Sequence, residues 1–79
     1  MKLTYAPRYN VAYIYLKEKN AQVETIQVSD QMNVDIAPDG TIYGIELLNA
    51  NQLLGADSQG KLIFFNEALG ESAEIQLAL

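Results

Sequence analysis

Short blocks in which apolar and polar residues alternate run through most of this chain. Strict alternation puts successive side chains on opposite faces of an extended segment, so it predicts β-strands that bury one face. The first blocks cover residues 2–5, 11–17, 22–28 and 32–36. Turn-forming residues at 7–10, 18–20 and 29–31 separate them, which predicts antiparallel strands joined by short connections.

The stretch NVDIAPDGTIYGIELL at residues 33–48 is the most sharply defined of these patterns. Pro38-Asp39-Gly40 predicts a tight hairpin turn, since proline presets the first turn position and glycine adopts the left-handed conformation that closes it. Beyond the turn, uninterrupted alternation would put Glu46 on the apolar face. An extra residue reverses the alternation, and a glycine inside a strand is typical of such a bulge. We therefore predict a bulge at Tyr43-Gly44 that turns Glu46 outward and its two aliphatic neighbours inward.

The last third of the chain carries weaker signals. Residues 49–55 predict about one helical turn, because an asparagine N-cap, two leucines and a terminal glycine occur in that order. Turn residues at 57–60 precede the apolar run KLIFF at 61–65, and alternation returns at residues 72–79. Both segments are predicted strands, and a helix over 66–79 is the alternative, which Gly70 disfavours.

Together these elements predict a mainly β protein: an antiparallel meander of about five to seven short strands with one short helical turn. A sheet with an apolar face needs a covering layer. We expect either a small sandwich, in which the C-terminal strands fold over the others, or packing against a second subunit. The length of 79 residues fits a single domain, residues 1–79, in which residues 51–79 add two strands to the meander.

The chain has no cysteine and no histidine. Disulfides, thiolate zinc sites, cysteine nucleophiles and imidazole bases are therefore excluded, and we expect no cofactor. A chain this short buries only about 60% of its surface when it folds alone, which favours a homo-oligomer, most simply a homodimer.

The net charge and the short apolar runs argue against two classes of partner, nucleic acids and membranes. A formal net charge of −5 repels phosphate, so we expect no nucleic-acid partner. The longest apolar run, from Val11 to Leu16, is too short for a membrane span or a signal peptide. We therefore expect a cytoplasmic protein with no membrane partner.

Asp35, Asp39 and Glu46 are the carboxylates that the predicted hairpin brings together. Oxygen ligands suit hard cations, so a divalent-cation site is one interpretation. The structural interpretation assigns Asp39 to the turn and the other two to solvated strand faces. Acid–base catalysis would need a pocket that shifts a pKa, and the sequence reveals none. We therefore expect no catalytic and no metal-binding residue, and a structural motif formed by Asp35, Asp39, Gly40, Gly44 and Glu46.

Aromatic residues are concentrated in two places. Four tyrosines lie close together in the sequence near the N-terminus, with Arg8 between two of them. Aromatic residues with arginine are typical of binding hot spots, although half-exposed strands also favour tyrosine. The KLIFF run is apolar on both faces, which suits a covered strand or an interface. The candidate interface residues are Tyr5, Tyr9, Tyr13, Tyr15, Leu62, Phe64 and Phe65.

Two stretches follow a family pattern. They are TYAPRYNVAYIYL, with Tyr5, Pro7, Tyr13, Ile14 and Leu16, and NVDIAPDGTIYGIELLNA, with Asp35, Asp39, Gly40, Gly44, Ile45, Glu46 and Leu47. With these motifs residues 1–50 resemble the small prokaryotic family known as domain of unknown function 2283. The resemblance implies a compact antiparallel meander of unknown activity, often encoded near small toxin-like proteins. This chain has Ala6, Asn10 and Ala37 where that family has aspartates, so a function that needs those carboxylates would be impaired.

These observations favour a bacterial, non-enzymatic interaction module that associates with itself. The resemblance implies one alternative, an antitoxin-like or regulatory partner of a small basic protein. The acidic hairpin suggests another, a protein that binds a small ligand or a divalent cation.

Overall fold

The computed structural model describes residues 1–18, 22–55 and 60–79, and it is mainly β, as the alternation predicts. The predicted turns at 18–20 and 57–60 lie for the most part outside the described residues. The described elements are β1 (Lys2–Ala6), β2 (Val11–Tyr15), β3 (Glu24–Ser29), β4 (Met32–Ile36), β5 (Ile42–Leu48), α1 (Ala50–Gly55), β6 (Lys61–Asn66) and β7 (Glu71–Gln76).

The first five strands form one antiparallel sheet with the order β1-β2-β5-β4-β3. Strands β3 to β5 form a meander, and β5 then pairs with β2, so β2 and β3 are not neighbours although they are consecutive along the chain. The amides of Leu16 and Lys17 extend this pairing past the end of β2, since both donate to the carbonyl of Tyr43, at 3.0 and 3.2 Å. The two edges of the sheet are therefore β1 and β3.

The register gives this sheet one apolar and one polar face, because partners across an antiparallel ladder share a face. One row crosses all five strands and is entirely aliphatic: Leu3, Ile14, Ile45, Val34 and Ile26. The neighbouring row on the opposite side is Thr4, Tyr13, Glu46, Asn33 and Gln27. We call the sides that carry these rows the apolar face and the polar face.

Helix α1 covers one end of the apolar face. Ala50 forms the buried cluster of the domain with Ala12 of β2 and Leu47 of β5, and Leu54 packs against that cluster. Farther along the same face, Ile26 and Ile42 are 44% and 43% exposed. A helix of six residues is too short to cover the aliphatic row from edge to edge.

The predicted bulge in β5 is confirmed. Ile36 pairs with Ile42 but the preceding residue, Asp35, pairs with Gly44, so Tyr43 is the extra residue. Because of this shift, Glu46 lies on the polar face and its aliphatic neighbours lie on the apolar face, as the register predicts. Gly44 is also required for a second reason: a Cβ atom there would lie 2.5 Å from two ring carbons of Tyr13.

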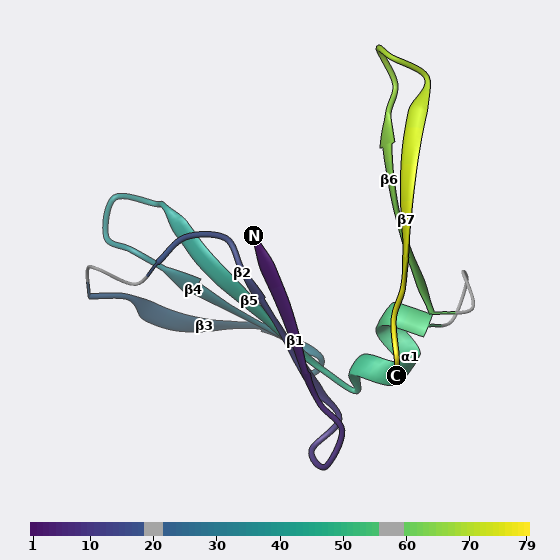
Figure 1. The fold of residues 1–79 in the computed structure, drawn as a ribbon. Helices are drawn as coiled ribbons and strands as arrows, with labels where there is room; N and C mark the ends of the chain where they lie inside the picture. The colour runs from purple at the N-terminus through teal and green to yellow at the C-terminus, as the bar shows by residue number, and fades with distance from the viewer. Residues whose placement is uncertain (19–21, 56–59) are drawn as a thin grey trace.

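Strands β6 and β7 form a separate two-stranded sheet, which we call the C-terminal hairpin. Both segments are strands, and the alternative helix over 66–79 is not formed. The Asn66 side chain accepts hydrogen bonds from the amides of Ala68 and Leu69 at 3.0 and 3.1 Å, which fixes the turn. Figure 1 shows this hairpin extending from α1 and diverging from the five-stranded sheet. We expected the apolar face to be covered either by the C-terminal strands or by a second subunit. The first arrangement, the intramolecular sandwich, is not formed.

The contact between Tyr13 and Gly44 leads to a stability prediction. Gly44→Ala should lower the free energy of unfolding by about 2–3 kcal/mol, because the new methyl group overlaps the Tyr13 ring. In a Tyr13→Ala background the same substitution should cost less than about 1 kcal/mol, since the overlapping ring is gone. Urea denaturation of the four proteins of this cycle measures the difference.

Gly55→Ala is the matched control, because a Cβ atom there would meet the nearest side chain, Leu79, at an ordinary contact distance of 3.6 Å. It should change the stability by less than about 0.5 kcal/mol. An equal cost of Gly44→Ala with and without the Tyr13 ring would contradict this explanation of the glycine.

Candidate functional site

Asp35 lies beneath Tyr13 on the polar face. Its carboxylate accepts hydrogen bonds from the Tyr13 hydroxyl at Oδ2 and from the Thr25 hydroxyl, at 2.6 Å, at Oδ1. These two donors come from β2 and β3, on either side of β4 and β5 in the sheet. We expected a solvated carboxylate, but Asp35 is only 7% exposed. The ring of Tyr13, which crosses above Gly44 to reach it, accounts for the difference.

The other two carboxylates of the hairpin have separate partners. Glu46 accepts a hydrogen bond from the Asn33 side chain at 2.8 Å, across the β4–β5 pair. Asp39 is in the exposed turn, where the Thr41 amide donates to it at 2.9 Å. This amide, and secondly the Thr41 hydroxyl, hold the pKa of Asp39 below its ordinary value. Each carboxylate therefore has a structural role at its own position.

The three carboxylates do not converge on one point. In the described parts of the chain, no group of three or more Asp, Glu, His or Cys side chains is arranged to hold a metal ion. The arrangement of Asp35, with two hydroxyl donors on its two oxygens, ties three strands together.

The structure divides the four N-terminal tyrosines among three places. Tyr5 lies on the apolar face, packed against the buried cluster beside α1. Tyr13 and Tyr15 lie on the polar face with ring centroids 4.4 Å apart. Tyr9 is 70% exposed in the β1–β2 turn, where the Arg8 guanidinium lies 5.6 Å from its ring centroid. They therefore form no single aromatic patch.

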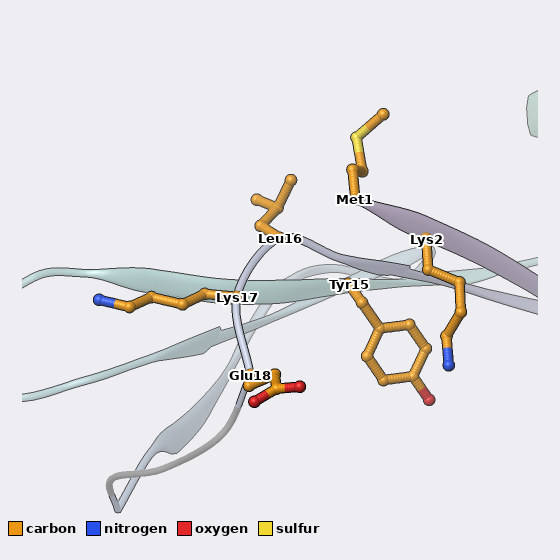
Figure 2. Close-up of a pocket in the computed structure, with 6 residues that line it drawn as sticks. All are labelled: Met1, Lys2, Tyr15, Leu16, Lys17 and Glu18. Atoms are coloured by element: carbon orange, nitrogen blue, oxygen red, sulfur yellow. The ribbon is translucent and has the colours of Figure 1, made fainter.

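An open concavity of about 360 Å³ lies near the N-terminus, between the ends of β1 and β2. Figure 2 shows that Met1 and Leu16 extend to one side of the strands, whereas Lys2, Tyr15 and Glu18 extend to the other. The Lys2 ammonium lies 4.6 Å from the Tyr15 ring centroid. A ligand pocket normally has a few polar groups aimed at one point, and the side chains here diverge.

Asn10 is a structural residue that the sequence reasoning missed. It has a left-handed backbone, with φ at 53°, and its carbonyl accepts the amide of Ala50 at 3.0 Å. Its side-chain oxygen accepts from the Asn51 amide at 2.9 Å and from the Tyr5 hydroxyl at 3.2 Å. The turn between β1 and β2 thus caps the start of α1 from 41 residues away in the sequence. Asparagine tolerates a left-handed backbone better than most residues. An asparagine in the predicted turn at 7–10 was therefore the one sequence signal that could have indicated this conformation.

More large apolar side chains are exposed to solvent than are buried among the described residues. Within the described chain no large side chain is fully buried, and the buried apolar residues are Ala12, Ala37, Tyr43, Leu47 and Ala50. The candidate residues of the C-terminal hairpin are exposed instead: Leu62 by 40%, Phe64 by 67% and Phe65 by 55%. Exposed large apolar side chains thus occur along the hairpin and on the far part of the apolar face, and also at other places such as Met1, Tyr9 and Leu53.

The family model described as "Protein of unknown function (DUF2283)" matches residues 2–51. The match ends within α1, so the C-terminal hairpin lies outside it. No curated protein and no solved structure matches the chain. No helix in the described ranges is long and apolar enough to cross a membrane.

Substitutions of the two strand carboxylates should have different effects. Asp35→Ala should lower the free energy of unfolding by about 2 kcal/mol or more, because it leaves the Tyr13 and Thr25 hydroxyls without their acceptor. Glu46→Gln should change it by less than about 0.5 kcal/mol, since the amide oxygen still accepts from Asn33. Denaturation curves of both variants test this prediction. An equal loss of unfolding free energy in the two variants would contradict the different roles assigned to Asp35 and Glu46.

Proposed function

The chain belongs to the DUF2283 family of proteins of unknown function, and from that premise we propose that it is a non-enzymatic module whose role depends on association with a second copy of itself. The observation that carries the proposal is the amount of surface that a single copy leaves in contact with water. We further propose that the homodimer works in the cytoplasm, because a chain without cysteine does not depend on an oxidising compartment for its fold.

A single copy is expanded for its length. Its accessible surface is 5981 Å², whereas a compact monomer of this mass exposes about 4,800 Å². Its radius of gyration is 14.1 Å, against about 12 Å for a compact chain of this length. The excess surface, about 1,200 Å², is at least what each partner buries in a stable complex of standard size, about 800 Å².

Much of the exposed side-chain surface is apolar. A two-stranded hairpin is marginally stable by itself in water, and the C-terminal hairpin has large apolar side chains on both of its faces. Ile63 is 52% exposed and Ile75 is 58% exposed, on opposite faces. Such a hairpin needs a covering surface, and exposed apolar strands that lack one aggregate.

A catalytic or cation-binding role has less support. The two strand carboxylates of the acidic hairpin are engaged by neighbouring side chains, and the third caps a turn. The N-terminal concavity has diverging side chains. Residues that hold structural hydrogen bonds at separate places are poorly arranged for chemistry on one substrate.

Sedimentation equilibrium of the full chain tests the proposal. We expect twice the mass of one chain at micromolar concentration, and a melting temperature that rises with protein concentration, because unfolding is then coupled to dissociation. A monomer whose melting temperature does not depend on its concentration would overturn the proposal. A monomer that is stabilised by added Ca²⁺ or Mg²⁺ would favour the cation-binding alternative instead.

A further inference from the structure

Among the described residues, two apolar surfaces lack a cover: one face of the C-terminal hairpin and the part of the apolar face beyond α1. We propose, on the basis of the self-association proposed above, that the C-terminal hairpin of each copy packs on the apolar face of the five-stranded sheet of the other copy. The dimer is then a reciprocal exchange of hairpins about a two-fold axis. Its contact surfaces are the hairpin face that carries Leu62 and Phe64 and the part of the apolar face beyond α1.

The two faces of the hairpin differ in polarity. On one face Leu62 pairs with Ile75 and Phe64 pairs with Ala73, so both central pairs are apolar. On the other face Ile63 pairs with Glu74 and Phe65 pairs with Ser72. The Lys61 ammonium lies 3.9 Å from the Glu74 carboxylate on this second side, where both are exposed. The face with Leu62 and Phe64 is therefore the one that is suited to burial.

The attachment of the hairpin holds it away from its own sheet. At its base, the Leu77 amide donates to the Gly60 carbonyl at 2.7 Å, and the Gln76 side chain reaches the same carbonyl at 3.4 Å. Leu79 lies close to Gly55, the last residue of α1. The two hydrogen bonds close the base of the hairpin itself, and the Leu79 side chain joins that base to the helix. The hairpin diverges from the five-stranded sheet (Figure 1). Folding back over its own apolar face would break the contact between Leu79 and Gly55, whereas packing on a second copy keeps it.

The two surfaces also match in size. Strands of six residues make a hairpin about 20 Å long. Five strands at about 4.8 Å spacing make a sheet about 19 Å wide, and the aliphatic row crosses that whole width. The hairpin is thus long enough to cover the row from β1 to β3.

The chemistry of the two surfaces favours a second copy over a basic partner. The aliphatic row carries no charge from one edge of the sheet to the other, and the two central pairs on the matching hairpin face carry none either. A basic protein would gain no ion pair from this row or from these two pairs. Reciprocal packing covers both surfaces of both copies and closes the assembly, because the two-fold axis repeats the same contact.

Charged substitutions test each surface separately. Phe64→Glu and Ile26→Lys place a charge on the hairpin face and on the aliphatic row, at positions that are 67% and 44% exposed in one copy. Each should weaken the dimer at least about 100-fold, because the change affects both equivalent contacts. Phe65→Glu and Gln27→Lys carry the same charges on the opposite face of the hairpin and of β3, and they should leave the dissociation constant within about threefold of the unmodified chain. Sedimentation at several concentrations measures all five proteins.

An equimolar mixture of the two disruptive variants, Phe64→Glu and Ile26→Lys, separates hairpin exchange from other dimers. One contact in the mixed dimer joins an unmodified hairpin to an unmodified apolar face. The other contact brings the carboxylate introduced in one copy toward the ammonium introduced in the other. The mixture should associate at least about tenfold more tightly than either variant alone, because one contact regains its apolar packing.

Three results would overturn the proposed exchange. The first is a dimer that Ile26→Lys does not weaken, since the sheet would then not be the docking surface. The second is an equal effect of Phe64→Glu and Phe65→Glu, and the third is a mixture no tighter than its components. If the unmodified chain is itself a monomer, self-association fails as a whole. If that chain dimerises but Phe64→Glu dimerises equally well, only the exchange of hairpins fails.

Discussion

An antiparallel sheet with one apolar face must cover that face, and this requirement governs the whole structure. The covering element that the chain places on its own sheet is α1, a helix of six residues whose buried side chain is Ala50. It covers the row that includes Ala12 and Leu47 and leaves the far end of the sheet exposed. The C-terminal hairpin carries exposed apolar side chains, but it diverges from this sheet. The self-association that we propose rests on this mismatch between the sheet and its cover.

The polar face is organised by a contact of a different kind. The Tyr13 ring crosses the strand next to it above Gly44, and its hydroxyl reaches Asp35 on the strand beyond. The glycine makes room for the ring, and the bulge at Tyr43 sets the register that aligns Gly44 with Asp35. The conspicuous glycine and carboxylates of the hairpin motif are thus explained by packing and hydrogen bonding. Within the family match, Asp35 and Gly44 act as parts of a structural unit.

The features that could be predicted from the sequence are those that depend on residues adjacent in the chain. The turn at Pro38-Asp39-Gly40 and the bulge beside Gly44 could be predicted because each depends on a few adjacent residues. The strand at 71–76 agrees with the alternation at 72–79, although the sequence left a helix over 66–79 as an alternative. The pairing of β2 with β5 could not be predicted, because no local pattern states which distant strand becomes a neighbour. The burial of Asp35 escaped prediction for the same reason, since its partners Tyr13 and Thr25 lie on other strands.

Hydrogen exchange of the C-terminal hairpin, followed as the protein is diluted, tests most directly whether a second copy stabilises it. If the hairpin depends on its partner, the paired backbone amides of β6 and β7 should be protected at high protein concentration. They should lose that protection when dilution dissociates the dimer, while the central strands β2 and β5 keep theirs. Protection of the hairpin that stays the same at every concentration would contradict the account.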